Sequence, residues 1–416
     1  MEKTGFPIWP QIDNVPRQYP WLADDISCDV CVIGGGVTGA MCAMRLAERG
    51  VATVLLTAKQ IGFGATASTM PSAEYDCGQT IRSLAKYSDR ETAVRLMTLA
   101  QEAIDSLEQL SINSADDFGF KRRDCMLFTD DNSQLELLSR EYIERRKAGF
   151  DCTYISRSAA SDVFAFDIAG AIVTKGGAGE LDPYRLAHLC IDRAVSAGAR
   201  VYENTKAARI DCDDEGDCTI TTSTYRRVRA EKVVIAAGGA CADILDGLAS
   251  PRTFFMIASS PMAHIPDWPG RCVLRSFGTP DVTYASAPDG RIFSCGLATS
   301  VVDEHSRLGG IVRIPSLHRK RFEEMEMGAH YIFPNAGDIY FKYAYAARCC
   351  QTHDGLPVIG VSDEQPGCIF AVCCGSGGVL LSEVASRMVI DSVEGRETHD
   401  ARIFSPERRS LCAMGR

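Results

Sequence analysis

The sequence predicts an α/β fold class, and three observations lead to this prediction. The chain has 416 residues, of which 46% are hydrophobic and 24% charged, and this is typical of a folded protein with two or three domains. Near residue 30, an apolar strand, a glycine-rich turn and an apolar helix follow one another. Near residue 375, a second glycine-rich turn opens another apolar helix. Strands followed closely by helices indicate a parallel sheet covered by helices.

The charge balance and hydropathy exclude some partners. The chain has 54 acidic and 44 basic side chains, so its net charge is −10 and nucleic acid is not an expected partner. No segment approaches the ~18 continuous apolar residues of a membrane span. The N-terminus lacks the basic residues followed by an apolar run that are typical of a signal peptide. We therefore expect no membrane span and a cytoplasmic protein.

The 18 cysteines are spread from Cys28 to Cys412 rather than clustered. A chain of this length can bury a core without disulfides, so we expect reduced and mostly buried thiols. Cys28 and Cys31 form a CxxC motif at the start of a strand, where we expect their side chains on opposite faces. No second CxxC follows at zinc spacing and the seven histidines form no HxxxH pair, so we expect no metal site.

The strongest signal is a strand, a turn, a helix and a second strand within residues 29–58. Residues 30–33 form a short apolar run, which is typical of a buried parallel strand. Small and apolar residues then recur at helical spacing up to Gly50, a residue suited to end a helix. Residues 54–56 form the second strand. This order is that of a Rossmann-like dinucleotide-binding unit.

The turn inside this unit contains the residues that we expect to bind a ligand. Gly34, Gly36 and Gly39 have the GxGxxG spacing: the first permits the tight turn, the second lets the backbone approach a pyrophosphate, and the third lets helix and strand pack closely. The phosphates would lie at the helix start, where amides such as those of Val37 and Thr38 attract anions. We therefore predict that these five residues bind a dinucleotide.

The end of the second strand lacks one expected residue. An Asp or Glu usually binds the ribose hydroxyls there, whereas this sequence has Thr57 followed by Ala58. Thr57 can still hydrogen-bond a hydroxyl, although more weakly than a carboxylate. The neighbouring Lys59 leaves open a ribose 2′-phosphate, and hence NADP. We expect Thr57 and Ala58 to contact the ribose.

Three further segments favour FAD. Residues 61–69 are small and rich in hydroxyls, which suits a chain that passes close to a cofactor. Residues 232–239 form a strand-like run that ends in glycines, and residues 354–360 precede another strand. The glycine-rich turn after that strand opens a helix whose positive start would stabilise negative charge on a flavin. The residues expected to bind FAD in these segments are Thr66, Ala67, Ser68, Thr69, Ala237, Gly238, Asp354, Gly375, Ser376, Gly377, Gly378 and Val379.

In this order, these stretches resemble the D-amino-acid-oxidase-like superfamily of FAD-dependent oxidoreductases, which includes glycine oxidases, sarcosine oxidases and gamma-glutamylputrescine oxidoreductases. The resemblance extends from about residue 29 to residue 404 and includes residues 203–207, so that Ala207 joins the expected FAD-binding residues. It implies non-covalent FAD, while Cys349 and Cys350 leave a covalent bond open.

The resemblance also implies two interleaved domains: a Rossmann-like FAD-binding domain, and an α+β substrate domain built on a large mixed or antiparallel sheet. Helical periodicity in residues 80–112 and 131–149, and strand-like runs in residues 251–300, agree with the second domain. The expected ranges are 25–80, 170–245 and 346–405 for the FAD-binding domain, 81–169 and 246–345 for the substrate domain, and 1–24 for an N-terminal extension.

The implied reaction is oxidation of a C–N bond in a small amine or amino acid. A hydride would pass to flavin N5 and give an imine that water hydrolyses, and oxygen or another electron acceptor would reoxidise the flavin. A flavin-binding subunit without turnover stays open as an alternative, because Thr57, Leu297 and Ala298 stand where relatives carry carboxylates. A tRNA-modifying relative is also open, although the net charge of −10 opposes it.

Three residues are candidates for substrate binding: Arg275, Tyr284 and Arg348. Arg275 and Tyr284 lie on consecutive strand-like runs and could bind a carboxylate, the first through a bidentate guanidinium and the second through its hydroxyl. Arg348 precedes the turn at Asp354 and could face the flavin or the domain interface. Residues 291–296 lack the lysine with which sarcosine oxidases activate oxygen, which slightly favours another acceptor.

Overall fold

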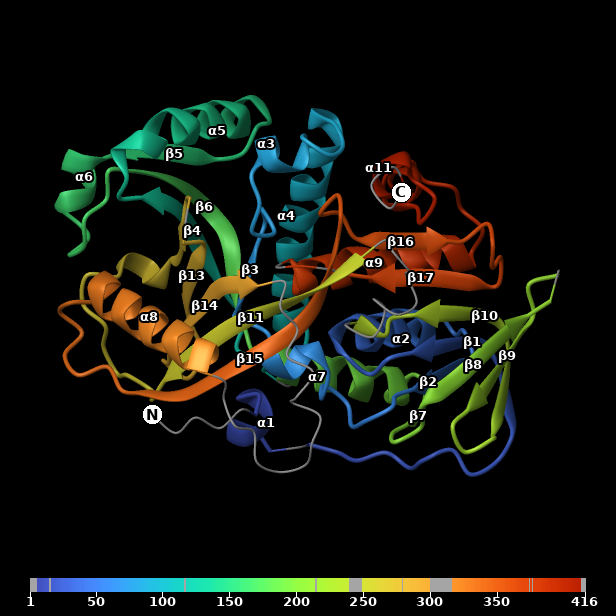
Figure 1. The fold of residues 1–416 in the computed structure, drawn as a ribbon. Coiled ribbons are helices and arrows are strands. Elements are labelled where there is room, and N and C mark those ends of the chain that lie inside the picture. Colours follow the sequence, from blue (N-terminus) through green and yellow to red (C-terminus); the bar gives the residue numbers. More distant parts are fainter. Residues whose placement is uncertain are drawn as a thin grey trace.

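Two large β-sheets organise the chain (Figure 1). The computed structural model describes residues 6–14, 16–115, 117–213, 215–238, 249–278, 280–299, 316–373, 375 and 377–412. Each sheet combines strands from distant parts of the sequence, so the two halves of the fold are interleaved. This agrees with the α/β class and with the large mixed sheets expected from the sequence.

The first sheet has eight strands, and its central four run parallel in the order β17, β10, β1, β2. β7 adds parallel to β2, whereas β16 runs antiparallel to β17. β8 and β9 form a hairpin that pairs with the first half of β10. The strands are β1 (Ile26–Ile33), β2 (Thr53–Leu56), β7 (Arg200–Tyr202), β8 (Ala207–Cys212), β9 (Cys218–Thr222), β10 (Arg227–Ile235), β16 (Val358–Val361) and β17 (Cys368–Val372).

Three helices cover one face of the first sheet: α2 (Val37–Glu48), α7 (Pro183–Ser196) and α9 (Gly378–Val393). Val32, Leu55 and Val234 are register partners on neighbouring strands, and all three point into the core that these helices share. Burial on both faces is what makes the parallel strands read as continuous apolar runs in the sequence.

The second sheet has nine strands and is mixed: β4 runs parallel to β12 and antiparallel to β6. Its other pairs are antiparallel. The strands are β3 (Ser72–Glu74), β4 (Lys121–Thr129), β5 (Cys152–Ser156), β6 (Gly170–Glu180), β11 (Ala249–Ser259), β12 (Val273–Ser276), β13 (Val282–Ser286), β14 (Ile292–Thr299) and β15 (Phe341–Thr352).

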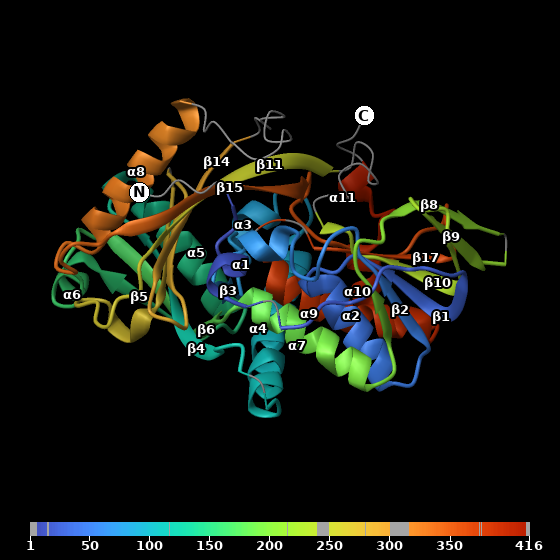
Figure 2. The ribbon, with the colours of Figure 1, turned by 90° about the horizontal axis from the view of Figure 1, so that it is seen from below.

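The two faces of the second sheet pack against different parts of the chain. On one face, Phe255 and Leu274 pack against Phe322 of α8 (Ser316–Ile332), a helix that Figure 2 shows far from the first sheet. On the other face, Phe293 packs against Trp9 of α1 (Trp9–Ile12). The remaining helices are α3 (Ile81–Leu84), α4 (Arg90–Ile112), α5 (Leu135–Lys147), α6 (Arg157–Ser161), α10 (His399–Phe404) and α11 (Arg409–Cys412), with 3-10 turns η1 (Ala65–Ser68), η2 (Asn132–Gln134) and η4 (Pro269–Arg271).

Two of the expected domain boundaries do not follow the sheets. β6 pairs with β3, β4 and β5, so residues 170–180 belong to the second sheet and not with the FAD-binding segments. β15 is one continuous strand, so a boundary at residue 346 divides it. Both corrections have one reason: strand-forming residues are visible in a sequence, but their partner strands are not.

The cysteines also differ from expectation in two respects. Cys212 and Cys218 form a disulfide across the β8–β9 hairpin, so the prediction that all thiols are reduced is wrong for this pair. Thirteen other cysteines whose side chains the structure describes form no disulfide with one another, and nine of them are buried, as expected. The Cys368 sulfur lies 3.8 Å from that of Cys212. These three sulfurs are the one grouping with metal-ligand spacing in the described part of the chain, and two of them are bonded to each other.

The backbone of the CxxC motif departs from a regular strand in a way that the sequence does not reveal. The amides of Asp29 and Val30 both donate to the carbonyl of Ala52, although the register with β10 stays unbroken. Cys28 and Cys31 consequently share a face and interact, whereas we expected them on opposite faces. The hydrogen bond between them lowers the pKa of the Cys28 thiol and raises that of Cys31.

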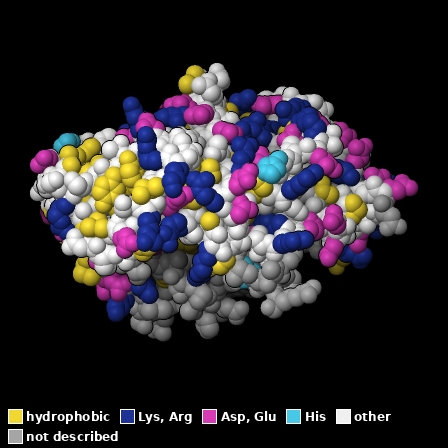
Figure 3. All heavy atoms as spheres, turned by 90° about the horizontal axis from the view of Figure 1, so that it is seen from above, with side chains coloured by type: hydrophobic (Ala, Val, Ile, Leu, Met, Phe, Trp, Pro, Cys, Tyr) yellow, Lys and Arg dark blue, Asp and Glu magenta, His cyan; other side chains and the backbone are white. Residues whose placement is uncertain are grey.

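The surface supports the expectation about charge. On the face drawn in Figure 3, basic and acidic side chains are interspersed rather than gathered into one basic area. Within the described ranges, none of the helices combines the length and the apolar character that a membrane crossing requires.

Replacing Cys212 and Cys218 together by serine should lower the free energy of unfolding by about 2 kcal/mol, because the bond closes a short loop and restricts the unfolded chain. Urea denaturation without reductant measures this change. With a reductant, the wild type should lose a similar amount and the double variant nothing. A wild-type midpoint that is indifferent to reductant would contradict the disulfide.

Candidate functional site

Four turns meet at one edge of the first sheet. Because β1, β2, β10 and β17 run parallel, the residues after their carboxyl ends share an edge: Gly34, Thr57, Ala236 and Cys373. The turn after β1 is held on both sides, since the Gly34 amide donates to Leu56 and the Ala236 amide donates to Ile33. Strand order reverses at β1, and such switch points are where open α/β sheets bind ligands.

Two glycines of the GxGxxG turn are required by their surroundings, and the third is less crowded. A Cβ atom on Gly34 would lie 2.2 Å from the Ala236 carbonyl oxygen, and its φ is +122°. A Cβ atom on Gly39 would lie 1.9 Å from the Gly34 oxygen. Gly36 is less crowded, with the Thr66 hydroxyl 3.1 Å from its Cβ position. The tight turn at Gly34 and the close packing at Gly39 therefore have a physical basis in this fold, and the approach of a pyrophosphate to Gly36 stays a prediction.

The start of α2 presents unpaired amides at this edge. The Val37 amide donates to the Thr66 hydroxyl at 2.9 Å, so residues 66–69 are held against the turn. The amides of Thr38 and Gly39 lie in the first helical turn and have no acceptor among the described residues. Two free amides on a positive helix end suit a pyrophosphate, so the residues present fit a dinucleotide.

The second glycine-rich turn lies beside the first. The Thr38 hydroxyl is 2.7 Å from the hydroxyl of Ser382 in α9, and Arg45 of α2 binds Ser386 and Glu383. Gly377 caps α9, followed by Gly378 and Val379. Gly375 has a φ of +81°, and Ser376 lies outside the described residues. The two helix starts therefore converge, which is the arrangement that one nucleotide bound across both turns requires.

The remaining expected FAD residues lie around the same edge. Thr57 is buried, and its backbone bonds to Tyr202 and Thr205 close the turn after β2. Ala58 is exposed. Ala207 begins β8, and Ala237 and Gly238 follow β10. The sequence offered no role for Glu203, whose buried carboxylate accepts the amides of Ile61 and Tyr19 and so shapes this region.

Asp354 does not offer its carboxylate to a cofactor. Arg408 donates two hydrogen bonds to it, at 2.7 and 2.9 Å, and Ser410 donates a third at 2.7 Å. Burial alone would raise the pKa of Asp354, but the Arg408 hydrogen bonds and charge hold it below its ordinary value. We expected a cofactor contact here; the side chain instead anchors the C-terminal segment, and only the adjacent backbone remains available.

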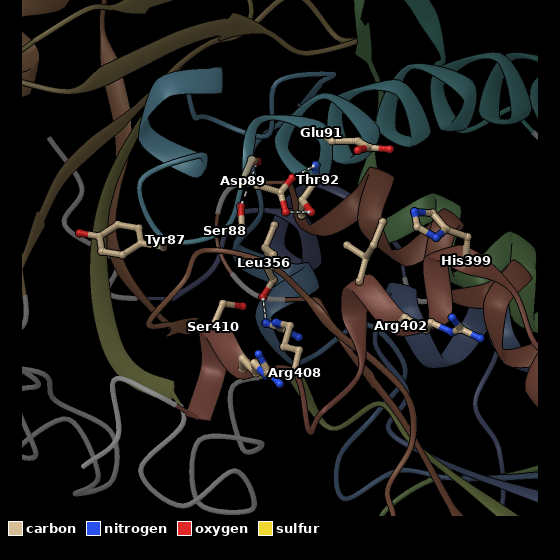
Figure 4. Close-up of a pocket in the computed structure, with 12 residues that line it drawn as sticks. Tyr87, Ser88, Asp89, Glu91, Thr92, Leu356, His399, Arg402, Arg408 and Ser410 are labelled. Carbon is tan, nitrogen blue, oxygen red and sulfur yellow. Dashed lines mark hydrogen bonds between the residues drawn. The ribbon is translucent and has the colours of Figure 1, made fainter.

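A cavity of about 630 Å³ lies next to this ion pair and away from the strand ends. Figure 4 shows its lining, which includes Asp89 just before α4, Thr92 of α4, Arg408, and Arg402 and His399 of α10. The Arg408 guanidinium is occupied by Asp354 and by backbone carbonyls. The cavity is therefore separate from the glycine-rich turns.

Arg275 and Tyr284 do not form a joint substrate site. In the register of β12 and β13, Leu274 pairs with Tyr284 and Arg275 pairs with Thr283, so the two candidates point to opposite faces. Tyr284 packs against Phe333 in the core under α8. The prediction that both bind one carboxylate is therefore wrong.

Arg275 points to the other face and is already paired. Its guanidinium donates to Asp76 at 2.6 Å, and Arg145 donates to the same oxygen at 2.9 Å. Arg145 also binds Glu141 and the Tyr75 hydroxyl, at 2.8 and 2.9 Å. Burial opposes ionisation of Asp76, yet the two arginines lower its pKa. No sequence motif indicates this network; the spacing of Glu141 and Arg145 on a helix is its one visible sign.

Arg348, the third candidate, lies in β15, where its backbone pairs with Thr253. Its side chain lies outside the described residues. A substrate role for Arg348 therefore stays a prediction.

The fold and the edge geometry define a dinucleotide-binding oxidoreductase class. The family model "FAD dependent oxidoreductase" matches residues 29–392, and the chain belongs to this family. Glycine oxidase of Geobacillus kaustophilus (strain HTA426) is 24% identical over 387 residues, covering 89% of this chain and 94% of that protein. The family uses FAD, so FAD is the cofactor of this protein.

Other relatives agree on the fold. A Rieske 2Fe-2S iron-sulfur protein, YhfW, of Bacillus subtilis (strain 168) is 23% identical over 97% of this chain and 75% of its own length. Gamma-glutamylputrescine oxidoreductase of Escherichia coli (strain K12) is 28% identical over 55% of this chain and 52% of its own. The crystal structure of the Geobacillus kaustophilus glycine oxidase superimposes with a TM-score of 0.77 at 22% identity, covering 92% of this chain and 99% of that one.

Replacing Gly39 by valine should abolish FAD binding, because its Cβ position is already 1.9 Å from a backbone oxygen and the helix start must move away. The flavin absorbance per mole of purified protein measures this. Glu48→Ala, at the exposed end of the same helix, is the matched control and should retain FAD. Full flavin content in Gly39→Val would contradict the assignment of this turn.

Replacing Arg408 by alanine should lower the free energy of unfolding by about 3–5 kcal/mol, because it leaves the buried Asp354 carboxylate without its partner. Urea denaturation at neutral pH measures the change. Arg402→Ala removes an arginine whose side chain is 81% exposed and should change stability by less than about 0.5 kcal/mol. Equal effects of the two variants would contradict the buried ion pair.

Proposed function

We propose that this protein oxidises a C–N bond of a small amine or amino acid, with hydride transfer to FAD and hydrolysis of the resulting imine. The observation that carries the proposal is the convergence of the α2 and α9 starts, joined through Thr38 and Ser382, at the switch point of the first sheet. The names of the relatives, glycine oxidase and gamma-glutamylputrescine oxidoreductase, support the substrate class.

The chain's own groups have separate tasks in this proposal. Bound FAD supplies the two-electron acceptor. The free amides of Thr38 and Gly39 hold the pyrophosphate, and Thr66 keeps the following loop in place. The start of α9 provides a positive helix end, which favours the reduced and more negative form of the cofactor. The second sheet supplies the residues that position the substrate and exclude water.

The electron acceptor is oxygen or another molecule. Residues 291–296 contain no lysine that could activate oxygen, and this supports an acceptor other than oxygen. Peroxide formation and dye reduction, measured on one preparation, distinguish the two. The compartment in this proposal is the cytoplasm. The thirteen described cysteines without a disulfide among themselves support a reducing environment, and the Cys212–Cys218 disulfide opposes it.

The alternative is a flavin-binding protein without turnover. One observation favours it: Arg275 is neutralised by Asp76 and Tyr284 faces away, so the expected carboxylate site is not assembled. Reduction of the bound flavin by any substrate would exclude this alternative.

The purified protein should contain FAD, visible in its absorption spectrum. Acid precipitation should release the FAD from the protein, because the protein binds it non-covalently. Anaerobic addition of primary amines, N-methyl amines and amino acids should bleach the flavin with at least one of them. Absence of FAD, both as purified and after its addition, would refute the proposed function. FAD that no compound reduces would instead favour the non-catalytic alternative.

A further inference from the structure

Three cysteine sulfurs meet where the β8–β9 hairpin approaches the start of β17. The sulfurs of Cys212, Cys218 and Cys368 all lie within 4.8 Å of one another, and those of Cys212 and Cys368 are 3.8 Å apart. Cys212 and Cys218 share the disulfide described above, and Cys368 takes no part in that bond. The sequence does not indicate this group, because Cys368 lies 156 positions after Cys212. The tertiary structure alone assembles it.

The edge of β10 holds the three residues together. Its first half pairs with β9, in which Cys218 lies opposite Ala230, and its second half pairs with β17, in which Cys368 lies opposite Val233. Within the hairpin, Cys212 lies opposite Cys218. Backbone hydrogen bonds therefore fix the positions from which the three side chains reach one another.

Gly367, the residue before β17, gives the sulfurs the space that they occupy. A Cβ atom on this glycine would lie 2.3 Å from the Cys218 sulfur and 3.0 Å from the Cys212 sulfur. The backbone of Gly367 cannot move away, because its carbonyl accepts the Val233 amide at 2.9 Å. A larger residue here would push the hairpin away from β17. The close approach of the sulfurs is therefore built into the backbone.

The spacing of the sulfurs suits a metal ion that prefers sulfur ligands, once the disulfide is reduced. In a tetrahedral zinc site with zinc–sulfur bonds of about 2.3 Å, two ligand sulfurs lie about 3.8 Å apart. The sulfurs of Cys212 and Cys368 already have this separation. Reduction frees the sulfur of Cys218 to move to a similar distance from both. Three thiolates then surround one position and leave a fourth ligand place for water.

A pocket of about 330 Å³ gives this group access to solvent. Its lining includes Cys218 together with the carboxylates of Asp213, Asp217 and Glu231, and Arg229 is the one basic side chain in the lining. An excess of carboxylates attracts a cation to the mouth of the pocket. A small reductant and a metal ion can therefore both reach the sulfur of Cys218.

Lys232 of β10 supplies the positive charge that such a site would need. Burial raises the pKa of the Cys368 thiol, and the charge of Lys232 acts in the opposite direction, so the ammonium lies close enough to favour the thiolate. Its Nζ is also 3.0 Å from the Cβ position of Gly216, whose carbonyl oxygen lies 3.5 Å from the Cys218 sulfur. Three thiolates and one divalent cation have a net charge of −1, which one lysine neutralises.

We propose that Cys212, Cys218 and Cys368 bind a zinc ion when the Cys212–Cys218 disulfide is reduced. A thiol reductant supplies two electrons, the S–S bond breaks, two thiols form, and the reductant leaves as its own disulfide. Zinc then replaces the thiol protons, which are released to solvent. The disulfide and the metal exclude each other, because both use the same sulfurs. A reducing cytoplasm favours the metal-bound state.

The two states differ in what they hold together. The disulfide connects only β8 and β9, whereas zinc also binds Cys368 at the start of β17. β17 leads into the second glycine-rich turn, so the metal would connect the hairpin to a strand that supports the cofactor edge. The reduced protein should therefore unfold at a higher urea concentration with zinc than with a chelator.

The first test uses the full chain after reduction by a phosphine and removal of metal with a chelator. Zinc chloride is added, and the zinc that remains after gel filtration is measured by atomic absorption. The reduced protein should retain one equivalent, and the protein with its disulfide re-formed should retain none. Cys368→Ser should weaken zinc binding roughly a hundredfold. Cys28→Ser, which changes another cysteine of the same pocket, is the matched control and should bind zinc as the wild type does.

A second measurement identifies the ligands in the wild type and does not depend on a variant that folds. Zinc should slow the alkylation of Cys212, Cys218 and Cys368 by iodoacetamide in the reduced protein, which mass spectrometry of the peptides measures residue by residue. Cys28 lines the same pocket and should react at the same rate with and without zinc.

Each outcome decides for or against the metal site. Zinc that is lost on oxidation and that protects these three cysteines supports it. The site is refuted by a reduced protein that retains no zinc, by an oxidised protein that retains it, or by protection of other cysteines instead. None of these measurements involves reduction of the flavin, so the inference and the proposed function stand or fall separately.

Discussion

The close approach of α2 to the strands beneath it and to α9 is the constraint on which the candidate site depends. Gly39 has no space for a Cβ atom, and Thr38 reaches Ser382 only because the two helix starts are so near. Arg45 adds a second link, to Glu383 and Ser386 of α9. These contacts bring two positive helix ends to one edge, where their fields add at an anionic cofactor.

A buried charge network joins the segment after β3 to α5 and β12. Asp76 accepts from Arg145 and Arg275, which come from these two elements, and Cys77 of the same segment lies against Gly377, the cap of α9. Removing one member of such a network leaves an unpaired charge in the interior. The network therefore fixes where the segment after β3 lies relative to the cofactor turns, and it uses the arginine that the sequence suggested for a substrate.

The dinucleotide-binding unit of residues 29–58 could be predicted well because the contacts that shape it are local. A strand, a turn and a helix within thirty residues allow few backbone conformations. The Cβ positions of Gly34 and Gly39 are blocked by atoms of that unit or of the neighbouring strand's end. Prediction failed where side-chain direction depends on a partner. Arg275 and Tyr284 seemed equivalent as strand residues, yet the register of β12 and β13 separates them. An irregularity of the backbone at Asp29 likewise brings Cys28 and Cys31 to one face, where the sequence predicted opposite faces.

By itself the sequence determined the class of fold, the two glycine-rich turns and the FAD-dependent family, because these follow from short-range spacing and from backbone geometry that only glycine permits. The tertiary structure decided which strands are partners, that Asp354 binds Arg408, and that Arg275 binds Asp76. Those features depend on residues tens to hundreds of positions apart, and which of them meet is settled only when the whole chain packs.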